Sequence, residues 1–235
     1  MKLTWLGQAG YVITTRGGTR IMIDPYLSDN LYNTKGEKFT RCVPIDESWL
    51  HNDIDVLVFS HNHDDHTDPV SVSKILDRDK PVTVLAPMNN WDVLRHTYDA
   101  KHNYLMFDAG IEITIGDALI RSVPAAHSDV SGIGIIIDDG EKSVYHTGDT
   151  MFRRDLPSNI DCVLTAMIFP INGVGNNMNA RDAKRFADIV KPDKVFPMHW
   201  DMFKAFGCDV GEFCALCDQA PYEVVIPKWY EEIEL

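Results

Sequence analysis

Short runs of apolar or alternating residues, separated by glycine, proline and polar turns, recur along the chain and predict β-strands. The first three runs, over 3–6, 11–15 and 20–24, are joined by tight turns such as Gly17-Gly18 and predict a β-meander. The remaining strands are expected over 54–60, 82–86, 111–115, 119–123, 133–138, 142–147, 161–166, 194–197 and 223–226.

Helical patterns interrupt these strands over 68–77, 90–98 and 180–190. The first helix has proline in its first turn, at Pro69, where the missing N–H costs nothing. The polar connection over 27–53 is long enough to be a candidate functional loop. Strands come in runs with helices between them in both halves, so we expect an α/β (α+β) chain of two sheets packed face to face with helices outside, forming one domain over 1–235.

Composition narrows the classes of partner. The chain has 35 acidic and 22 basic residues and a formal net charge of −13, which argues against a nucleic-acid partner because phosphate binding needs a basic face. No apolar run reaches the roughly 18–20 residues of a membrane span. No apolar signal core opens the sequence, so we expect a cytoplasmic protein without a membrane partner.

Five cysteines, an odd number, indicate free thiols instead of a disulfide framework. Cys214-Ala215-Leu216-Cys217 has the CxxC form, and Cys208 lies close by. A structural zinc site needs four ligands, and no second close pair is present. We therefore expect these three cysteines to pack in the core, with a metal or redox role as the alternative.

The most informative motif is His61-Asn62-His63-Asp64-Asp65-His66, directly after the strand expected over 54–60. His61 and His63, two residues apart on extended backbone, point the same way and can share one metal ion. Asp65 and His66 follow after the chain turns, and therefore suit a second ion. The alternative is a polar loop of solvated histidines.

Three further candidate ligands follow other expected strands: His127, Asp149 and His199. Each comes where a strand ends in small or turn-forming residues, and functional side chains are commonly presented from such rigidly held loops. His146, just before the Asp149 turn, is a candidate to support that ligand by a hydrogen bond.

In order and setting, these residues resemble the metal ligands of the metallo-β-lactamase superfamily over nearly the whole chain. The resemblance implies a four-layer αββα sandwich holding two divalent metal ions. It also implies that Asp24 supports the ligand loop without binding a metal. The implied ligands are His61, His63 and His127 for one ion, Asp65, His66 and His199 for the other, and Asp149 as the bridge.

Within the superfamily, the segments 56–69, 145–150, 170–180 and 197–206 resemble the L-ascorbate-6-phosphate lactonase-like branch. Two divalent ions about 3.5–4 Å apart can hold a hydroxide that attacks a carbonyl or phosphoryl centre. Histidine and aspartate ligands suit zinc or manganese, with iron less favoured. We expect Asp65 to orient the nucleophile and take its proton, and Asp149 to act with it as a catalytic residue.

The leading hypothesis is a lactonase acting on a phosphorylated sugar acid such as L-ascorbate 6-phosphate. The alternative hydrolase is a phosphodiesterase for a small cyclic nucleotide or similar phosphodiester, which the same metal pair serves. A di-iron redox enzyme would need an electron donor, and the chain has neither an iron–sulfur cysteine set nor a fused flavin-type domain. A non-enzymatic interaction module would predict lost ligands, whereas all of them are present.

Two divalent ions outweigh the two ligand aspartates and leave a local charge of roughly +2, so a small anionic substrate is compatible with the acidic chain. A homo-oligomer is also compatible with the resemblance.

Basic side chains near the ligands are candidate phosphate clamps, with ordinary surface cations as the alternative. These are Arg41, Arg153, Arg154 and Lys204. Asparagines in a glycine-rich loop are candidates to bind a polyol, with plain turn residues as the alternative. These are Asn172, Asn176, Asn177 and Asn179.

Overall fold

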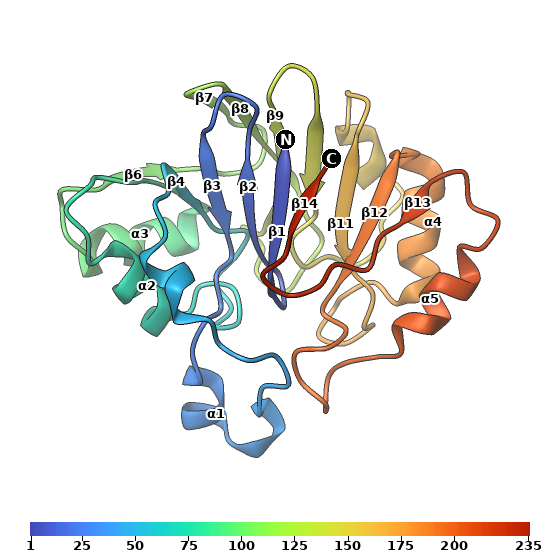
Figure 1. Cartoon of the computed structure of the whole chain (residues 1–235), viewed down its shortest axis with the longest axis horizontal. Coiled ribbons are helices and arrows are strands. Elements are labelled where there is room, and N and C mark those ends of the chain that lie inside the picture. Colours follow the sequence, from blue (N-terminus) through green and yellow to red (C-terminus); the bar gives the residue numbers. More distant parts are fainter.

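Two seven-stranded sheets form the centre of the computed structural model, which describes residues 1–235 (Figure 1). The first sheet has the order β14 (Glu232–Glu234), β1 (Lys2–Gly7), β2 (Gly10–Thr14), β3 (Arg20–Ile23), β4 (Val56–Val58), β5 (Thr83–Ala86), β6 (Asn103–Met106). The second has the order β13 (Glu223–Val224), β12 (Lys194–Met198), β11 (Ala166–Pro170), β10 (Ser143–His146), β9 (Ile133–Asp138), β8 (Ala118–Pro124), β7 (Glu112–Ile115).

Helices cover the outer face of each sheet. In Figure 1, α2 (Pro69–Leu76) and α3 (Met88–Thr97) lie outside the first sheet, and α4 (Ala180–Val190) and α5 (Val210–Leu216) lie outside the second. The short helix α1 (Asn30–Lys35) belongs to the long connection after β3. Three 3-10 turns complete the helices, at Glu37–Phe39, Glu47–His51 and Leu156–Asn159. The layers therefore run helix, sheet, sheet, helix, as the sequence predicts.

Alternation along the strands divides the core into three layers. On β3, Ile21 and Ile23 join the 22 buried residues of the cluster between the sheets. Met22, which points the opposite way, joins the 15 buried residues beneath α2 and α3. A third cluster of 17 buried residues, among them Phe186 and Phe213, fills the space beneath α4 and α5. Each sheet is thus apolar on both faces, which holds it rigidly between two layers.

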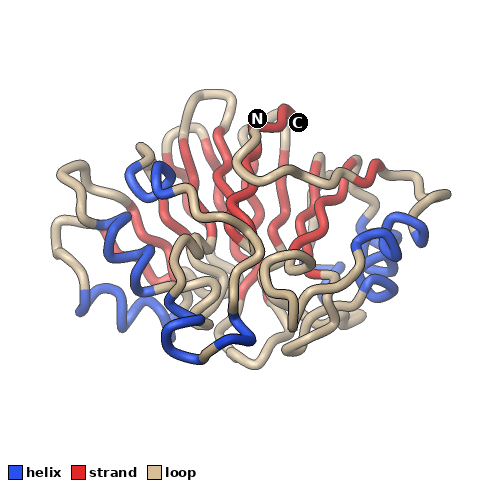
Figure 2. The backbone as a smooth tube through the Cα atoms, turned by 60° about the horizontal axis from the view of Figure 1, so that its bottom comes forward, coloured by secondary structure: helices blue, strands red, loops and turns tan.

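Parallel strands bring the loops of the two sheets to one end of the sandwich. β3, β4, β5 and β6 run parallel, as do β10, β11, β12 and β13. The lower end of Figure 1 is turned forward in Figure 2, where loops drawn in tan occupy it. Segments that are distant in sequence can therefore meet at this end.

The strand expected over 161–166 is wrong in position. The strand is β11, Ala166–Pro170, whose five residues are all buried between β10 and β12. A central parallel strand is covered on both faces and is therefore continuously apolar. Val163, by contrast, is 85% exposed and lies in the loop before the strand.

The strands β6 and β14 and the helix α1 were not expected from the sequence. The two strands lie at the edges of the first sheet and have half-buried or exposed residues. Edge strands need only one neighbour and little apolar surface, so their sequence pattern is weak. α1 has only one buried residue, Leu31, and no apolar stripe to mark it.

The cysteines are free thiols in the structure. Cys217 is buried in the cluster beneath α4 and α5, and Cys208 packs against that cluster. Burial raises the pKa of the Cys208 thiol to about 11, which keeps it protonated and unreactive at neutral pH. None of the groups of side chains that are close enough to hold a metal includes a cysteine. No helix has the length and apolar character needed to cross a membrane.

Hydrogen bonds to Asp117 join the two sheets at the end opposite the loops that follow the parallel strands. Asp117, in the β7–β8 turn, accepts hydrogen bonds from Thr15 Oγ1 at 2.6 Å, Thr19 Oγ1 at 2.7 Å and Gly17 N at 2.6 Å. These donors belong to the β2–β3 turn of the other sheet. The hydroxyl groups of Thr15 and Thr19 lower the pKa of the Asp117 carboxyl to about 2.

Replacing Asp117 by alanine removes these hydrogen bonds and is expected to lower the free energy of unfolding at pH 7. The loss is limited to about 1 kcal/mol because the Asp117 carboxylate is largely exposed. The folded pKa lies below the unfolded one, so this contribution is present above about pH 4 and is lost as the pH falls towards 2. Urea unfolding of wild type and variant at several pH values measures it. Glu112→Ala, on the exposed face of the same hairpin, is the control. A difference that persists unchanged at pH 2 would contradict this assignment.

Candidate metal centre

Seven side chains converge from four loops at the lower end of the sandwich. The loop between β4 and α2 carries His61, His63, Asp65 and His66. The other three residues come from loops of the second sheet, each within three residues of the end of a strand. They are His127 after β8, Asp149 after β10 and His199 after β12.

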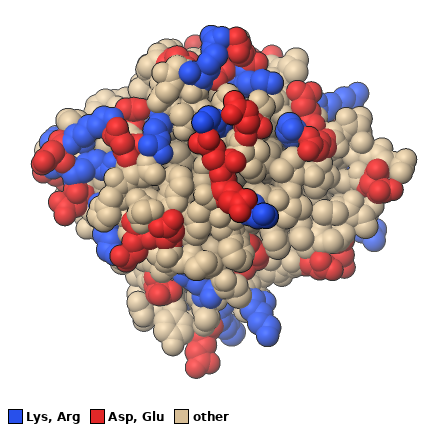
Figure 3. All heavy atoms as spheres, viewed as in Figure 1, with Lys and Arg blue, Asp and Glu red and all other residues tan.

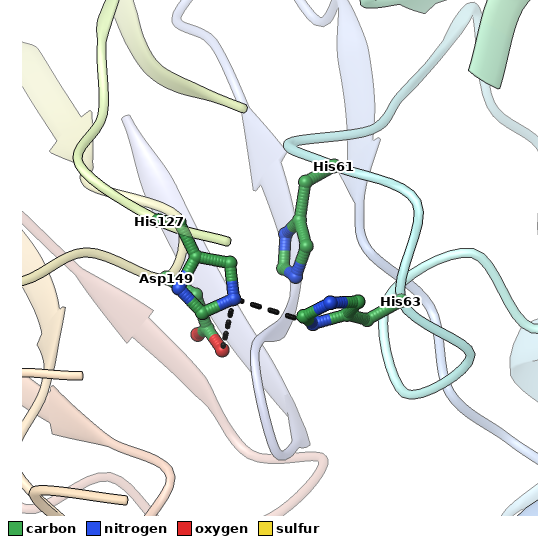
Figure 4. A group of neighbouring side chains, drawn as sticks. All are labelled: His61, His63, His127 and Asp149. Atoms are coloured by element: carbon green, nitrogen blue, oxygen red, sulfur yellow. Dashed lines mark hydrogen bonds and ion pairs between the residues drawn. The ribbon is translucent and has the colours of Figure 1, made fainter. Parts of the chain in front are cut away.

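The first cluster consists of His61, His63, His127 and Asp149, whose ligand atoms lie within 4.8 Å of one another. Figure 4 shows the three imidazole rings and the carboxylate turned towards a common centre. The Nε2 atom of His127 lies 3.2 Å from His63 Nδ1 and 3.8 Å from Asp149 Oδ2. This is the spacing expected of atoms that can share one small cation.

The second cluster consists of Asp65, His66 and His199, again with ligand atoms within 4.8 Å of one another. The Nε2 atoms of His66 and His199 face each other at 3.2 Å. Asp149 Oδ1 lies 2.9 Å from His199 Nε2 and 3.4 Å from His66 Nε2. One oxygen of Asp149 thus faces each cluster, the position that a bridging ligand requires.

The donor set fits divalent metal ions. His61 Nε2 is buried and has no hydrogen-bond partner, which is costly unless another species binds it. Burial lowers the pKa of His61 well below its usual value, and also lowers that of His127, so both rings are neutral and offer a lone pair. Burial would raise the pKa of Asp149, but His199 and His66 outweigh it and lower that pKa, so the carboxylate is charged. Nitrogen and carboxylate oxygen donors suit zinc and manganese.

Asp24 fixes the ligand loop from below. It is completely buried, and it accepts hydrogen bonds from Ser60 N at 2.7 Å and Ser60 Oγ at 2.5 Å. Its Oδ2 also lies 2.7 Å from His66 Nδ1, so a proton on that nitrogen leaves His66 Nε2 free for a metal. Asp24 also lies within ligand distance of His61 and His66, but these hydrogen bonds occupy its oxygens. The supporting contacts agree with the role that the resemblance implies.

His146 makes its hydrogen bonds to two backbone segments and not to the seven side chains. Its Nδ1 accepts from Gly148 N at 3.1 Å, so its Nε2 carries the proton and donates to Ala9 O at 2.9 Å. Burial lowers the pKa of His146, which is consistent with this neutral tautomer. It therefore supports Asp149 through the backbone next to it instead of through a direct hydrogen bond.

Gln8 is a site residue that the sequence reasoning missed. It lies in the tight turn between β1 and β2, with a positive φ of 51°. Its Nε2 donates to Asp65 Oδ2 at 2.7 Å and lies 3.1 Å from His199 Nδ1. The available signal was a polar side chain in a glycine-flanked turn. Only the folded structure shows that this turn faces the ligand loops.

Asp129 is a second missed residue, and it joins two ligand loops. The buried carboxylate accepts from Asn62 N at 3.1 Å, between His61 and His63. It also accepts from Asn89 Nδ2 at 2.7 Å, near the start of α3. Because Asp129 follows His127 by two residues, these bonds fix the His61–His63 loop relative to the loop of His127.

A cavity of about 200 Å³ opens beside the two clusters. Its walls come from the ligand loops, from the long connection after β3 and from the loops after β11 and β12. The lining residues are Gln8, Phe39, His63, Asp65, Asp149, Asn172, Val174, Gly175, Asn177, His199, Phe203 and Phe206.

Two of the asparagines predicted to bind substrate line this cavity. Asn177 Nδ2 donates to Asp149 Oδ2 at 3.0 Å, and Asn172 Nδ2 donates to Phe206 O at 3.0 Å. Asn179 instead caps α4 by accepting from Arg181 N and Asp182 N. Asn176 contributes its backbone oxygen, 3.4 Å from His127 Nδ1. The loop thus contacts the candidate ligands mainly to position them.

The structure does not bring the four predicted phosphate clamps to the cavity. Arg41 donates to Tyr26 O at 2.8 Å and Val43 O at 3.2 Å, and its guanidinium lies 4.7 Å from the centre of the Tyr26 ring. Arg153 pairs with Asp155, and Arg154 is exposed. Lys204 lines a different cavity, beside Tyr32 and Glu37. No lysine or arginine is among the lining residues of the cavity beside the clusters.

Charges on the outer surface show no basic field in the view of Figure 3. Lysine and arginine side chains occur there in small groups next to acidic ones. Several are paired, as in Lys2–Glu232 and Lys194–Glu223, both at 2.7 Å. This distribution and the net charge of −13 agree with the expectation that the chain does not bind nucleic acid, which stays a prediction.

Comparison with known proteins shows the family. A family model described as a beta-lactamase superfamily domain matches residues 2–199, and the chain belongs to this superfamily. It is similar to a UPF0173 metal-dependent hydrolase of Pyrococcus horikoshii, 28% identical over 247 residues covering all of both chains. It is also similar to a UPF0173 metal-dependent hydrolase of Carboxydothermus hydrogenoformans, 26% identical over 227 residues, covering 91% of this chain and 90% of the relative.

A solved structure with the same fold is Igni18, a metallo hydrolase from Ignicoccus hospitalis. It has a TM-score of 0.79 and 22% identity, over 100% of this chain and 98% of that one. The expected metallo-β-lactamase fold is therefore confirmed.

Proposed function

We propose that the chain is a metal-dependent hydrolase that holds two divalent ions, zinc or manganese, and opens a small lactone. The observation that carries the proposal is the pair of ligand clusters that share Asp149 beside a cavity of about 200 Å³. The names of the curated relatives, metal-dependent hydrolases, support the reaction class.

Each cluster supplies the donors of one ion. His61, His63 and His127 would hold the first, and Asp65, His66 and His199 the second, with Asp149 between them. Two such ions lower the pKa of a bound water and polarise the carbonyl that it attacks.

The carboxylate of Asp65 then accepts the proton of the attacking water. Asp65 lines the cavity, and Gln8 Nε2 holds its Oδ2 at 2.7 Å. One oxygen is thereby fixed, and the carboxylate is oriented to take a proton from the attacking water. The phenylalanines of the cavity wall exclude other water from the carbonyl. The bond between the carbonyl carbon and the ring oxygen breaks, Asp65 gives its proton to that oxygen, which leaves as an alcohol, and no covalent bond to the chain is needed.

The cavity favours a carbonyl substrate over a phosphodiester. A phosphodiester keeps a negative charge beside the reacting centre. With two ions bound, the charges of the lining carboxylates, Asp65 and Asp149, are offset, but no lysine or arginine lines the cavity to hold the phosphate oxygens. A lactone is neutral until it opens. The phosphate group of L-ascorbate 6-phosphate would likewise lack a basic partner in the cavity. We therefore propose the lactone ring as the reacting group and use L-ascorbate 6-phosphate only as a test substrate.

Hydrolysis assays test this directly. Protein reconstituted separately with zinc and manganese is given γ-butyrolactone, L-ascorbate 6-phosphate and bis(p-nitrophenyl) phosphate. We expect saturable opening of γ-butyrolactone that falls at least about a hundredfold in kcat for Asp65→Asn, because the proton acceptor is lost. Asp64→Asn, next in sequence and paired with Lys35 away from the clusters, is the control. Turnover of the phosphodiester alone would overturn the lactonase proposal and establish the phosphodiesterase alternative.

A further inference from the structure

We propose that the cavity beside the clusters selects an uncharged substrate carrying one small apolar group, aromatic or branched, that sits against Phe39, Phe203 and Phe206. This inference rests on the proposed function, because it concerns the substrate of the same site. It departs from the anionic, phosphorylated substrate that the sequence predicts.

Three phenylalanines form one side of the cavity. Phe39 meets Phe203 edge to face, with ring centres 5.5 Å apart, and meets Phe206 at 5.0 Å. Phe203 and Phe206 are 6.4 Å apart and nearly perpendicular. Such edge-to-face arrangements are favourable and present ring faces that can receive another apolar group. The side chain of Val174, 40% exposed, adds apolar surface to the lining.

This aromatic wall is held by the same loops as the candidate ligands. Phe203 and Phe206 follow His199 in the loop after β12, and Phe39 ends a 3-10 turn in the connection after β3. Cys42 N donates to Met202 O at 2.8 Å, and Arg41 pairs with Phe203 as an isolated β-bridge. The two loops are therefore joined, and the wall has a fixed position relative to the clusters.

Each amide nitrogen of the polar lining side chains already donates a hydrogen bond within the protein. Asn177 donates to Asp149, Asn172 donates to Phe206 O, and Gln8 donates to Asp65. Because a carboxylate and a carbonyl accept only, these contacts fix which end of each amide is nitrogen. The amide oxygens of Asn172 and Asn177 are left without partners. An anionic substituent against the aromatic side of the cavity, away from the ions, would meet aromatic rings and two unpartnered amide oxygens and no lysine or arginine. Leaving a charge unpaired there is costly.

The size of the cavity limits the substrate further. Pockets for drug-sized ligands usually measure roughly 300–1,000 Å³. This one measures about 200 Å³, so it suits a single lactone ring with one compact substituent.

A matched pair of substrates separates charge from size. γ-Phenyl-γ-butyrolactone and γ-carboxy-γ-butyrolactone share the lactone ring. The first carries a neutral aromatic substituent and the second an anionic one. For the metal-loaded protein, we expect kcat/KM to be at least about tenfold higher for the phenyl compound. Phe206→Ala and Phe39→Ala are expected to remove most of this preference, measured in each variant as the ratio of kcat/KM for the two compounds. Tyr32→Ala, an aromatic residue of α1 outside this cavity, is the control.

A gain-of-function variant keeps the inference testable if the phenylalanine variants fold poorly. Val174→Lys adds a cation at an exposed lining position. It should raise kcat/KM for the carboxy compound about tenfold without a similar gain for the phenyl compound. An equal gain for both compounds, or none for either, would overturn the inference.

Binding provides a readout that does not depend on turnover. The lactam 5-phenyl-2-pyrrolidinone, which resists hydrolysis, should bind in calorimetry and weaken about tenfold in Phe206→Ala. Binding of this kind without turnover of any lactone would support the cavity assignment and overturn the proposed function. Conversely, hydrolysis of the carboxy lactone by wild type with a kcat/KM equal to or above that for the phenyl lactone would support the proposed function. That result would overturn the inference about the cavity.

Discussion

Replacing Asp149 by alanine is expected to reduce hydrolysis at least about a hundredfold and to reduce metal binding at both clusters. The reason is its position, because Asp149 Oδ1 lies 2.9 Å from His199 Nε2 and Asp149 Oδ2 lies 3.8 Å from His127 Nε2. Asp24 also lies close to a histidine of each cluster, but its oxygens are occupied by Ser60 and His66. A change at this residue therefore affects two sites at once, whereas a change at a single histidine affects one.

The measurements for Asp149→Ala are metal content after reconstitution and kcat on the best lactone. Asp155→Ala, an exposed aspartate in the same segment that pairs with Arg153, is the matched control. The assignment of Asp149 as the shared ligand would be wrong if the variant took up as much metal as wild type. Loss of a single ion would likewise show that Asp149 serves only one cluster.

Replacing Asp24 by alanine is expected to lower the free energy of unfolding by about 3 kcal/mol. The completely buried carboxylate accepts from Ser60 N, Ser60 Oγ and His66 Nδ1. Alanine would leave Ser60 N without this acceptor and would remove the shortest contacts of Ser60 Oγ and His66 Nδ1. Asp24 also has a positive φ of 42°, which alanine adopts less readily than asparagine. Metal affinity should fall about 10- to 100-fold as well, because His66 loses its orientation.

Asp24→Asn is the internal control for this prediction. It keeps the size of the side chain and one acceptor oxygen, and it tolerates the backbone conformation. Urea unfolding with and without a chelator should therefore rank wild type, Asp24→Asn and Asp24→Ala in order of decreasing stability. Equal stability of the two variants would show that the lost acceptors do not carry the effect.

Much of the architecture could be predicted because its signals are local. Alternation on strands such as β7 and continuous apolar runs such as β9 follow from which faces are buried. The ligand loop is compact in sequence, with His61, His63, Asp65 and His66 within six residues. The distant ligands could be joined to it because each follows a strand, and parallel strands end at one edge of a sheet.

What the sequence could not predict depends on the course of loops. Gln8 and Asp129 are ordinary polar residues until the fold places them against Asp65 and Asn62. Arg41 has the chemistry of a phosphate clamp, but its loop turns the guanidinium towards backbone carbonyls. Phe39 and Phe206 lie in segments far apart in the chain, and their rings meet only after both loops close.

Metal content tests the central claim most directly. The chain is purified, stripped with a chelator, reconstituted with zinc or manganese and desalted, and its metal is measured by inductively coupled plasma mass spectrometry. The account predicts roughly two ions per chain for wild type and roughly one for His63→Ala or His199→Ala, each of which breaks one cluster. A wild-type chain that retains no metal, or whose metal content is unchanged in both variants, would contradict it.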